Sequence, residues 1–80
     1  MIKLRIIPNM FSPDGRTESE VMPAGPVSVS SLIAPEYRDG WRVLHSRLGA
    51  IDRDAWETTM TAPGDEIILT PIIVNAAMHL

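Results

Sequence analysis

The stretch that decides the fold is Pro63-Gly64-Asp65-Glu66-Ile67-Ile68-Leu69-Thr70-Pro71, in the last quarter of the chain. Its Pro-Gly-Asp start is typical of a turn, because proline presets φ and glycine tolerates positive φ. The run from Ile67 to Ile73 is apolar on both faces, which predicts a strand covered on both sides or flanked by neighbours in the centre of a sheet. Proline cannot donate to a ladder, so Pro71 predicts where this strand leaves the sheet or becomes an edge.

The other end of the chain predicts a β-hairpin. Apolar residues at positions 2, 4 and 6 alternate with Lys3 and Arg5, a period of two that indicates a strand with one buried face. Residues 11–15 form a Phe-Ser-Pro-Asp-Gly turn, and residues 17–22 form the returning strand. We expect Lys3 and Arg5 to face Glu18 and Glu20 across the hairpin, which favours this register.

A short helix is predicted after the hairpin. Apolar residues at positions 29, 32, 33 and 37 share one helical face, and the hydroxyl of Ser28 can cap the first turn. Pro35 is incompatible with a long helix, because it lacks a donor and clashes with the preceding turn. We therefore expect a helix from Val29 to about Ala34, followed by a kink or a second turn through Arg38.

A third strand and a second helical turn are predicted between this helix and the decisive stretch. Trp41, Val43 and His45 alternate with their neighbours as in a strand, and Gly49 turns the chain. Asp52 is positioned to cap a short helical turn that carries Trp56.

The predicted fold class is α+β: a small mixed sheet with one short helix packed across it. We expect one domain over residues 1–73 and an apolar C-terminal tail over residues 74–80. The predicted core consists of Leu4, Ile6, Leu32, Ile33, Val43, Trp56, Ile67 and Leu69. The order of hairpin, helix, strand, short turn and strand resembles the ubiquitin-like β-grasp proteins.

Two β-grasp families resemble the chain more specifically. Residues 50–56 and 63–71 are similar to the sulfur carriers of thiamine and molybdopterin synthesis, which act through a C-terminal Gly-Gly. This sequence reads Ile72-Ile73-Val74-Asn75-Ala76-Ala77-Met78-His79-Leu80 instead. A sulfur-carrier or ubiquitin-like protein that serves an adenylating enzyme therefore stands as the alternative expectation.

The main expectation rests on a second resemblance, to the N-terminal domain of phage tail assembly protein I. The chain resembles that domain in a proline-broken helix at residues 32–37, in Asp39-Gly40-Trp41, and in the Gly-Asp turn into the strand at residues 64–71. The resemblance implies a non-enzymatic protein-interaction module of the phage tail tip or of tail assembly. It implies phage tail proteins as partners and a virion tail location, reached by assembly in the host cytoplasm.

Composition excludes several other classes. The net charge is −3, and the seven basic residues are scattered, so no nucleic-acid patch is expected. No apolar run approaches the roughly 20 residues that a membrane span needs. The sequence holds no cysteine for a disulfide or thiolate metal site.

Neither catalysis, a metal site nor a cofactor is expected. His45 and Ser46 would lie on opposite faces of a strand, which prevents a hydrogen bond between them. His45 and His79 lack a third ligand at useful spacing. Asp52, Asp54 and Glu57 lack the ligand repeat of a calcium loop.

The expected partner-binding residues are the apolar side chains near the end of the chain together with one tryptophan. An exposed apolar tail usually contacts a partner, although it can also extend the last strand and fold back on its own domain. Trp41 is open between a core position and an interface position, whereas Trp56 is expected in the core. The predicted set is Trp41, Ile72, Ile73, Val74, Met78 and Leu80.

Overall fold

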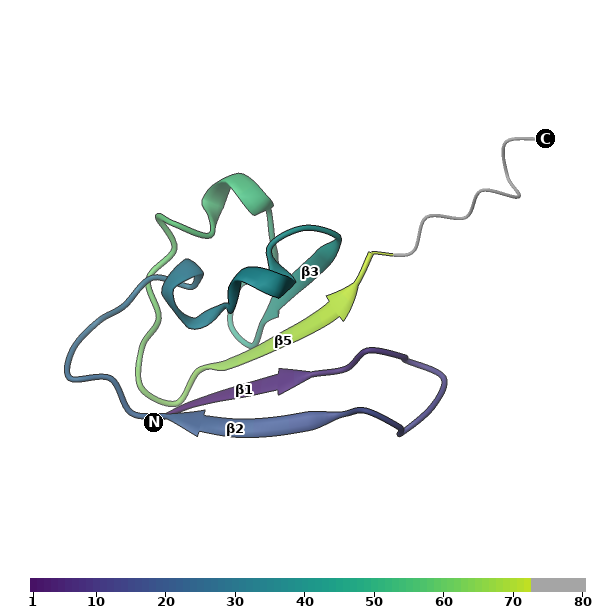
Figure 1. The fold of residues 1–80 in the computed structure, drawn as a ribbon. Helices are drawn as coiled ribbons and strands as arrows, with labels where there is room; N and C mark the ends of the chain where they lie inside the picture. The colour runs from purple at the N-terminus through teal and green to yellow at the C-terminus, as the bar shows by residue number, and fades with distance from the viewer. Residues whose placement is uncertain (73–80) are drawn as a thin grey trace.

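The computed structural model describes residues 1–72, which form a mixed five-stranded sheet with the order β2-β1-β5-β3-β4 (Figure 1). The strands are β1 (Ile2–Ile6), β2 (Thr17–Val21), β3 (Trp41–His45), β4 (Gly49–Ile51) and β5 (Glu66–Pro71). β1 and β5 are parallel, and the other neighbouring pairs are antiparallel. The strand predicted from the apolar run is therefore the central strand, flanked by β1 and β3.

The predicted hairpin of β1 and β2 is confirmed. Lys3 pairs with Glu20 and Arg5 with Glu18 in the antiparallel register. The salt bridge is diagonal, because Lys3 Nζ lies 3.3 Å from Glu18 Oε1. Gly15 closes the turn with φ of 77°, a value that side-chain-bearing residues rarely adopt.

The predicted α-helix at residues 29–34 is wrong. The chain forms two separate 3-10 turns there, η1 (Ser30–Leu32) and η2 (Pro35–Tyr37), and no α-helix occurs within residues 1–72. Ile33 and Ala34 are extended between the turns, with ψ of 119° and 151°. The cause is Pro35, whose ring disfavours helical geometry in the residue before it.

Local capping follows the prediction only in part. Ser28 Oγ does accept a hydrogen bond from the amide of Ser31 at 3.3 Å, although the residue at the cap position is Val29. The third turn, η3 (Arg53–Ala55), begins after Asp52 as expected, but the Asp52 side chain makes no capping hydrogen bond.

The core lies between the sheet and the turns that cover one of its faces (Figure 1). Trp56 is buried, and its indole Nε1 donates to the carbonyl of Ile51 at 3.1 Å, which confirms its predicted core position. Three predicted core residues, Leu4, Ile6 and Leu32, are half-buried and pack against this cluster. The fully buried apolar residues are Ile2, Val29, Ile33, Val43, Trp56, Ile67 and Leu69.

The alternation of the strands places a second set of side chains on the other face of the sheet. Arg5 Nη1 lies 3.0 Å from Glu66 Oε1 across β1 and β5. Leu44 and Ile68 pair in register beside them, half-buried. Among the helical segments within residues 1–72, none is long and apolar enough to cross a membrane.

Candidate functional site

Two predicted partner-binding residues lie together where β5 ends. Trp41 begins β3 and pairs in register with Pro71, the last residue of β5. The amide of Ile72 donates to the carbonyl of Gly40 at 2.8 Å, so the chain stays attached to β3 for one residue past the proline. The Ile72 side chain is 47% exposed at this end of the sheet.

Trp41 is half-buried. This exposure is intermediate between the core position and the interface position that the sequence left open for it. Its ring meets Tyr37 edge to face, with 4.7 Å between centroids and 86° between planes. Such a pair holds the indole in one orientation. Trp41 therefore belongs to the margin of the core, at the same end of the sheet as the exposed Ile72.

The remaining predicted partner-binding residues, Ile73, Val74, Met78 and Leu80, lie outside the described residues. The structure places Trp41 and Ile72 at the same end of the sheet, and the partner-binding role of every member of the set stays a prediction.

A buried polar cluster joins β3 to the turn before β5. His45 Nε2 lies 2.9 Å from Asp65 Oδ2, and Arg47 reaches both carboxylate oxygens, with Nε at 2.7 Å and Nη2 at 2.9 Å. The amide of Ala62 donates to Asp65 Oδ2 at 2.8 Å. Asp65 is only 3% exposed, and these donors compensate for its removal from water.

The charge on Asp65 is stabilised chiefly by one guanidinium. The hydrogen bonds from Arg47 hold the pKa of the Asp65 carboxyl well below its usual range, and the donors Ala62 and His45 add to this effect. Burial acts in the opposite direction but is outweighed. The same contact raises the pKa of Arg47. Asp65 therefore carries a buried negative charge at neutral pH.

The cluster is arranged to hold the fold together. His45 Nδ1 accepts from the amides of Arg47 and Leu48 at 3.0 and 3.2 Å, so both ring nitrogens are engaged. Ser46 Oγ accepts from the amide of Glu66 at 3.0 Å. A general base needs a free ring nitrogen beside a nucleophile, and His45 offers none in this arrangement.

Sequence reasoning missed this cluster, because it treated Asp65 as a turn residue and His45 as an isolated strand residue. The available signal was a basic residue, Arg47, in the turn just after His45, where a nearby carboxylate could meet both side chains. Their acidic partner is 20 residues away, and only the pairing of β3 with β5 brings it close.

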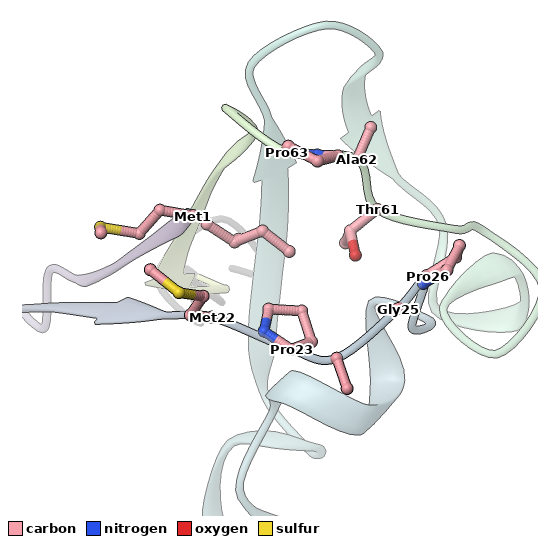
Figure 2. Close-up of a pocket in the computed structure, with 10 residues that line it drawn as sticks. Met1, Met22, Pro23, Gly25, Pro26, Thr61, Ala62 and Pro63 are labelled. Carbon is pink, nitrogen blue, oxygen red and sulfur yellow. The ribbon is translucent and has the colours of Figure 1, made fainter.

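Large apolar side chains are also exposed elsewhere on the described surface. Phe11, at the tip of the β1–β2 hairpin, is 91% exposed, and Met22, just after β2, is 74% exposed. Met22 borders an apolar pocket of about 280 Å³ between the N-terminus, the loop after β2 and the loop before β5 (Figure 2). Its lining includes Met1, Pro23 and Pro63.

Comparison with protein-family models, with curated proteins and with solved structures finds no match to this chain.

Proposed function

We propose that this protein is a non-enzymatic β-grasp module that docks on other protein chains as a component of a phage tail tip or of its assembly. The β-grasp assignment is supported by the strand order. The hairpins β1–β2 and β3–β4 flank the central last strand β5, which is parallel to the first strand β1, and short turns cover one face. The chain achieves this cover with 3-10 turns where β-grasp proteins carry a helix.

The observation that carries the docking proposal is the exposed Ile72 at the end of the sheet where Trp41 begins β3. The residue that follows β5 is apolar and 47% exposed, and it lies at the same end of the sheet as the indole that Tyr37 orients. The sequence that follows, residues 73–80, contains no charged residue. Apolar surface left in water forgoes about 25 cal/mol per Å², so such an end favours a partner that covers it.

The non-enzymatic part of the proposal is supported by the polar cluster. His45, Asp65 and Arg47 are hydrogen-bonded to one another or to backbone amides, and this is the arrangement expected of a structural network. The phage-tail part rests on the resemblance at residues 32–41 and 64–71. It implies a virion tail location.

The docking proposal is tested with one charge substitution and a matched control. Ile72→Asp places a carboxylate at the proposed contact. Met60→Asp does the same at a residue of equal exposure, 48%, outside that contact. Each tagged chain is co-expressed with candidate phage tail proteins, and complexes are measured by size-exclusion chromatography with light scattering.

We expect the wild-type and Met60→Asp chains to elute in a complex and the Ile72→Asp chain to elute alone. Melting temperatures should remain close to the wild-type value, because both side chains are partly in water. A complex that survives Ile72→Asp, or one that is lost equally in both variants, would count against docking at this end.

A further inference from the structure

The β1–β2 hairpin carries two unused surfaces at opposite ends. The loop after β1 presents Met10 and Phe11 at its tip, and the apolar pocket lies beside Met1 and Met22, at the start of β1 and the end of β2 (Figures 1 and 2). Five residues of strand, about 17 Å, separate the two ends. A chain cannot fold its own hairpin tip back into this pocket without breaking the hairpin.

The tip is organised before any partner arrives. Asn9 Oδ1 accepts from the amide of Phe11 at 2.9 Å, and Ser12 Oγ accepts from the amide of Asp14 at 3.2 Å. Pro8 packs close to the backbone of Gly15 on the other side of the loop. A preformed loop loses little conformational freedom on binding, so it suits an aromatic anchor.

The pocket matches an aromatic side chain in size and chemistry. Cavities of about 150 Å³ accept benzene, and this pocket measures about 280 Å³. Three prolines, Pro23, Pro26 and Pro63, offer no amide donor, and methionines adapt their shape to a bound ring. Figure 2 shows Met1 and Met22 on one side of the pocket and Pro63 and Ala62 on the other.

Charge is complementary at the same two ends. Arg16 at the base of the tip loop is exposed, and its guanidinium contacts only the carbonyl of Met10, at 3.4 Å, among the described residues. Glu20 lines a second hollow together with Lys3, Asp65 and Glu66, so acidic side chains predominate there, and this hollow shares Met1 with the apolar pocket. Neither Arg16 nor Glu20 joins an ion pair within residues 1–72.

From these observations we propose that Phe11 of one copy inserts into the pocket at Met22 of a second copy, with Arg16 beside Glu20. The contact is head to tail: each copy uses a different surface from its neighbour, which produces rings or open chains of more than two copies. A single tip in a single pocket buries little area, so the association is weak and needs a high local concentration. The inference goes beyond docking at Ile72 and does not depend on it.

The test uses two variants that can form one interface only. A ¹⁵N-labelled Phe11→Ser chain keeps its pocket and lacks a tip, and an unlabelled Met22→Glu chain keeps its tip and has a charged pocket. On titration to millimolar concentration, we expect saturable shifts of the amide signals of residues 22, 24, 25, 61 and 62. The unlabelled chain is the donor of the tip. A control donor that carries both Phe11→Ser and Met22→Glu should bind the labelled chain at least tenfold more weakly.

Further variants guard against trivial results. Ala24→Glu, at an exposed loop residue that lines the pocket, replaces Met22→Glu if that chain does not fold. Arg16→Glu in the donor should weaken binding several-fold, and Glu20→Arg in the labelled chain should restore it. Deleting residues 73–80 from the donor should leave its binding to the labelled chain unchanged.

The proposal is overturned if no pocket signal shifts at millimolar concentration, or if the doubly substituted donor shifts the signals equally. It is also overturned if deleting residues 73–80 removes the shifts while Phe11→Ser leaves them, because the tail would then be the occupant. A negative result in this titration of the purified chain leaves the docking proposal at Ile72 standing, because that proposal is measured with other proteins present.

Discussion

His45 Nε2 lies 2.9 Å from Asp65 Oδ2, and both side chains are almost completely removed from solvent. His45 belongs to β3, and Asp65 immediately precedes β5. The contact therefore fixes the turn before the central strand against the end of its neighbour. Because the imidazole Nδ1 accepts two amide hydrogens, the hydrogen of the neutral ring must be on Nε2, where it is donated to the carboxylate.

The first prediction concerns this tautomer. Long-range ¹H–¹⁵N correlation spectra of the folded chain at neutral pH should show His45 with a protonated Nε2 and an unprotonated Nδ1. The amide signals of Arg47 and Leu48 should move when His45 is replaced by glutamine, because their acceptor is lost. An Nδ1–H tautomer would show that the hydrogen-bond network is assigned wrongly.

The second prediction concerns the carboxylate. Asp65→Asn removes the charge that Arg47 and His45 contact, and it places an amide among their donors. We expect the free energy of unfolding by urea to fall by about 2–4 kcal/mol. A fully buried ion pair would lose more, but half of the Arg47 side chain is in solvent, which screens its interaction with Asp65. Asp54→Asn, at an exposed residue, is the control and should stay within about 0.5 kcal/mol of wild type.

The third prediction concerns pH. The pKa of Asp65 is lowered in the folded chain and returns to about 3.9 on unfolding. The unfolded state thus takes up a proton first as pH falls, so the stabilisation from Asp65 is complete above pH 4 and is lost progressively below it. The stability difference between wild type and Asp65→Asn should be largest at pH 7 and smaller at pH 3. A difference that is independent of pH would mean that the charge of Asp65 is not what stabilises the turn.

The fourth prediction concerns the core. Leu69 is fully buried on the central strand, whereas Leu32 is half-buried at its margin. Leu69→Ala should cost about 2–5 kcal/mol, and Leu32→Ala should cost less, because it leaves a smaller cavity. Thermal and urea unfolding of the two variants decide the order. Equal losses would show that the 3-10 turn at Leu32 is packed as firmly as the sheet.

Four of the five strands were predictable because their residues obey local rules, whereas β4 was not among the predicted strands. Alternation identified β1, β2 and β3, and an apolar run closed by Pro71 identified β5. The segment around Pro35 was harder, since the period of its apolar residues indicates a helix while the proline limits each piece to a single 3-10 turn. In the core, Ile2 and Val29 were missed because they stand at the ends of elements, where periodicity is weakest.

The candidate surfaces were predictable only where they follow from the sequence order, and their role in binding stays a prediction. Trp41 and Ile72 were both predicted, and the antiparallel pairing of β3 with β5 brings them to one end. The contact between His45 and Asp65 and the pocket at Met22 depend on which loops meet in space. The spacing of residues in a single sequence does not indicate which loops will meet.

Photo-crosslinking at Ile72 tests the central claim, docking through the end of β5, most directly. A photoreactive amino acid is placed at position 72 and, in a separate chain, at the equally exposed position 60. Each is irradiated in cells that also make the candidate tail proteins of the proposal, and the products are identified by mass spectrometry. We predict a product between position 72 and one defined tail protein, and none from position 60. Equal or absent crosslinking at both positions would contradict docking through this end of the sheet.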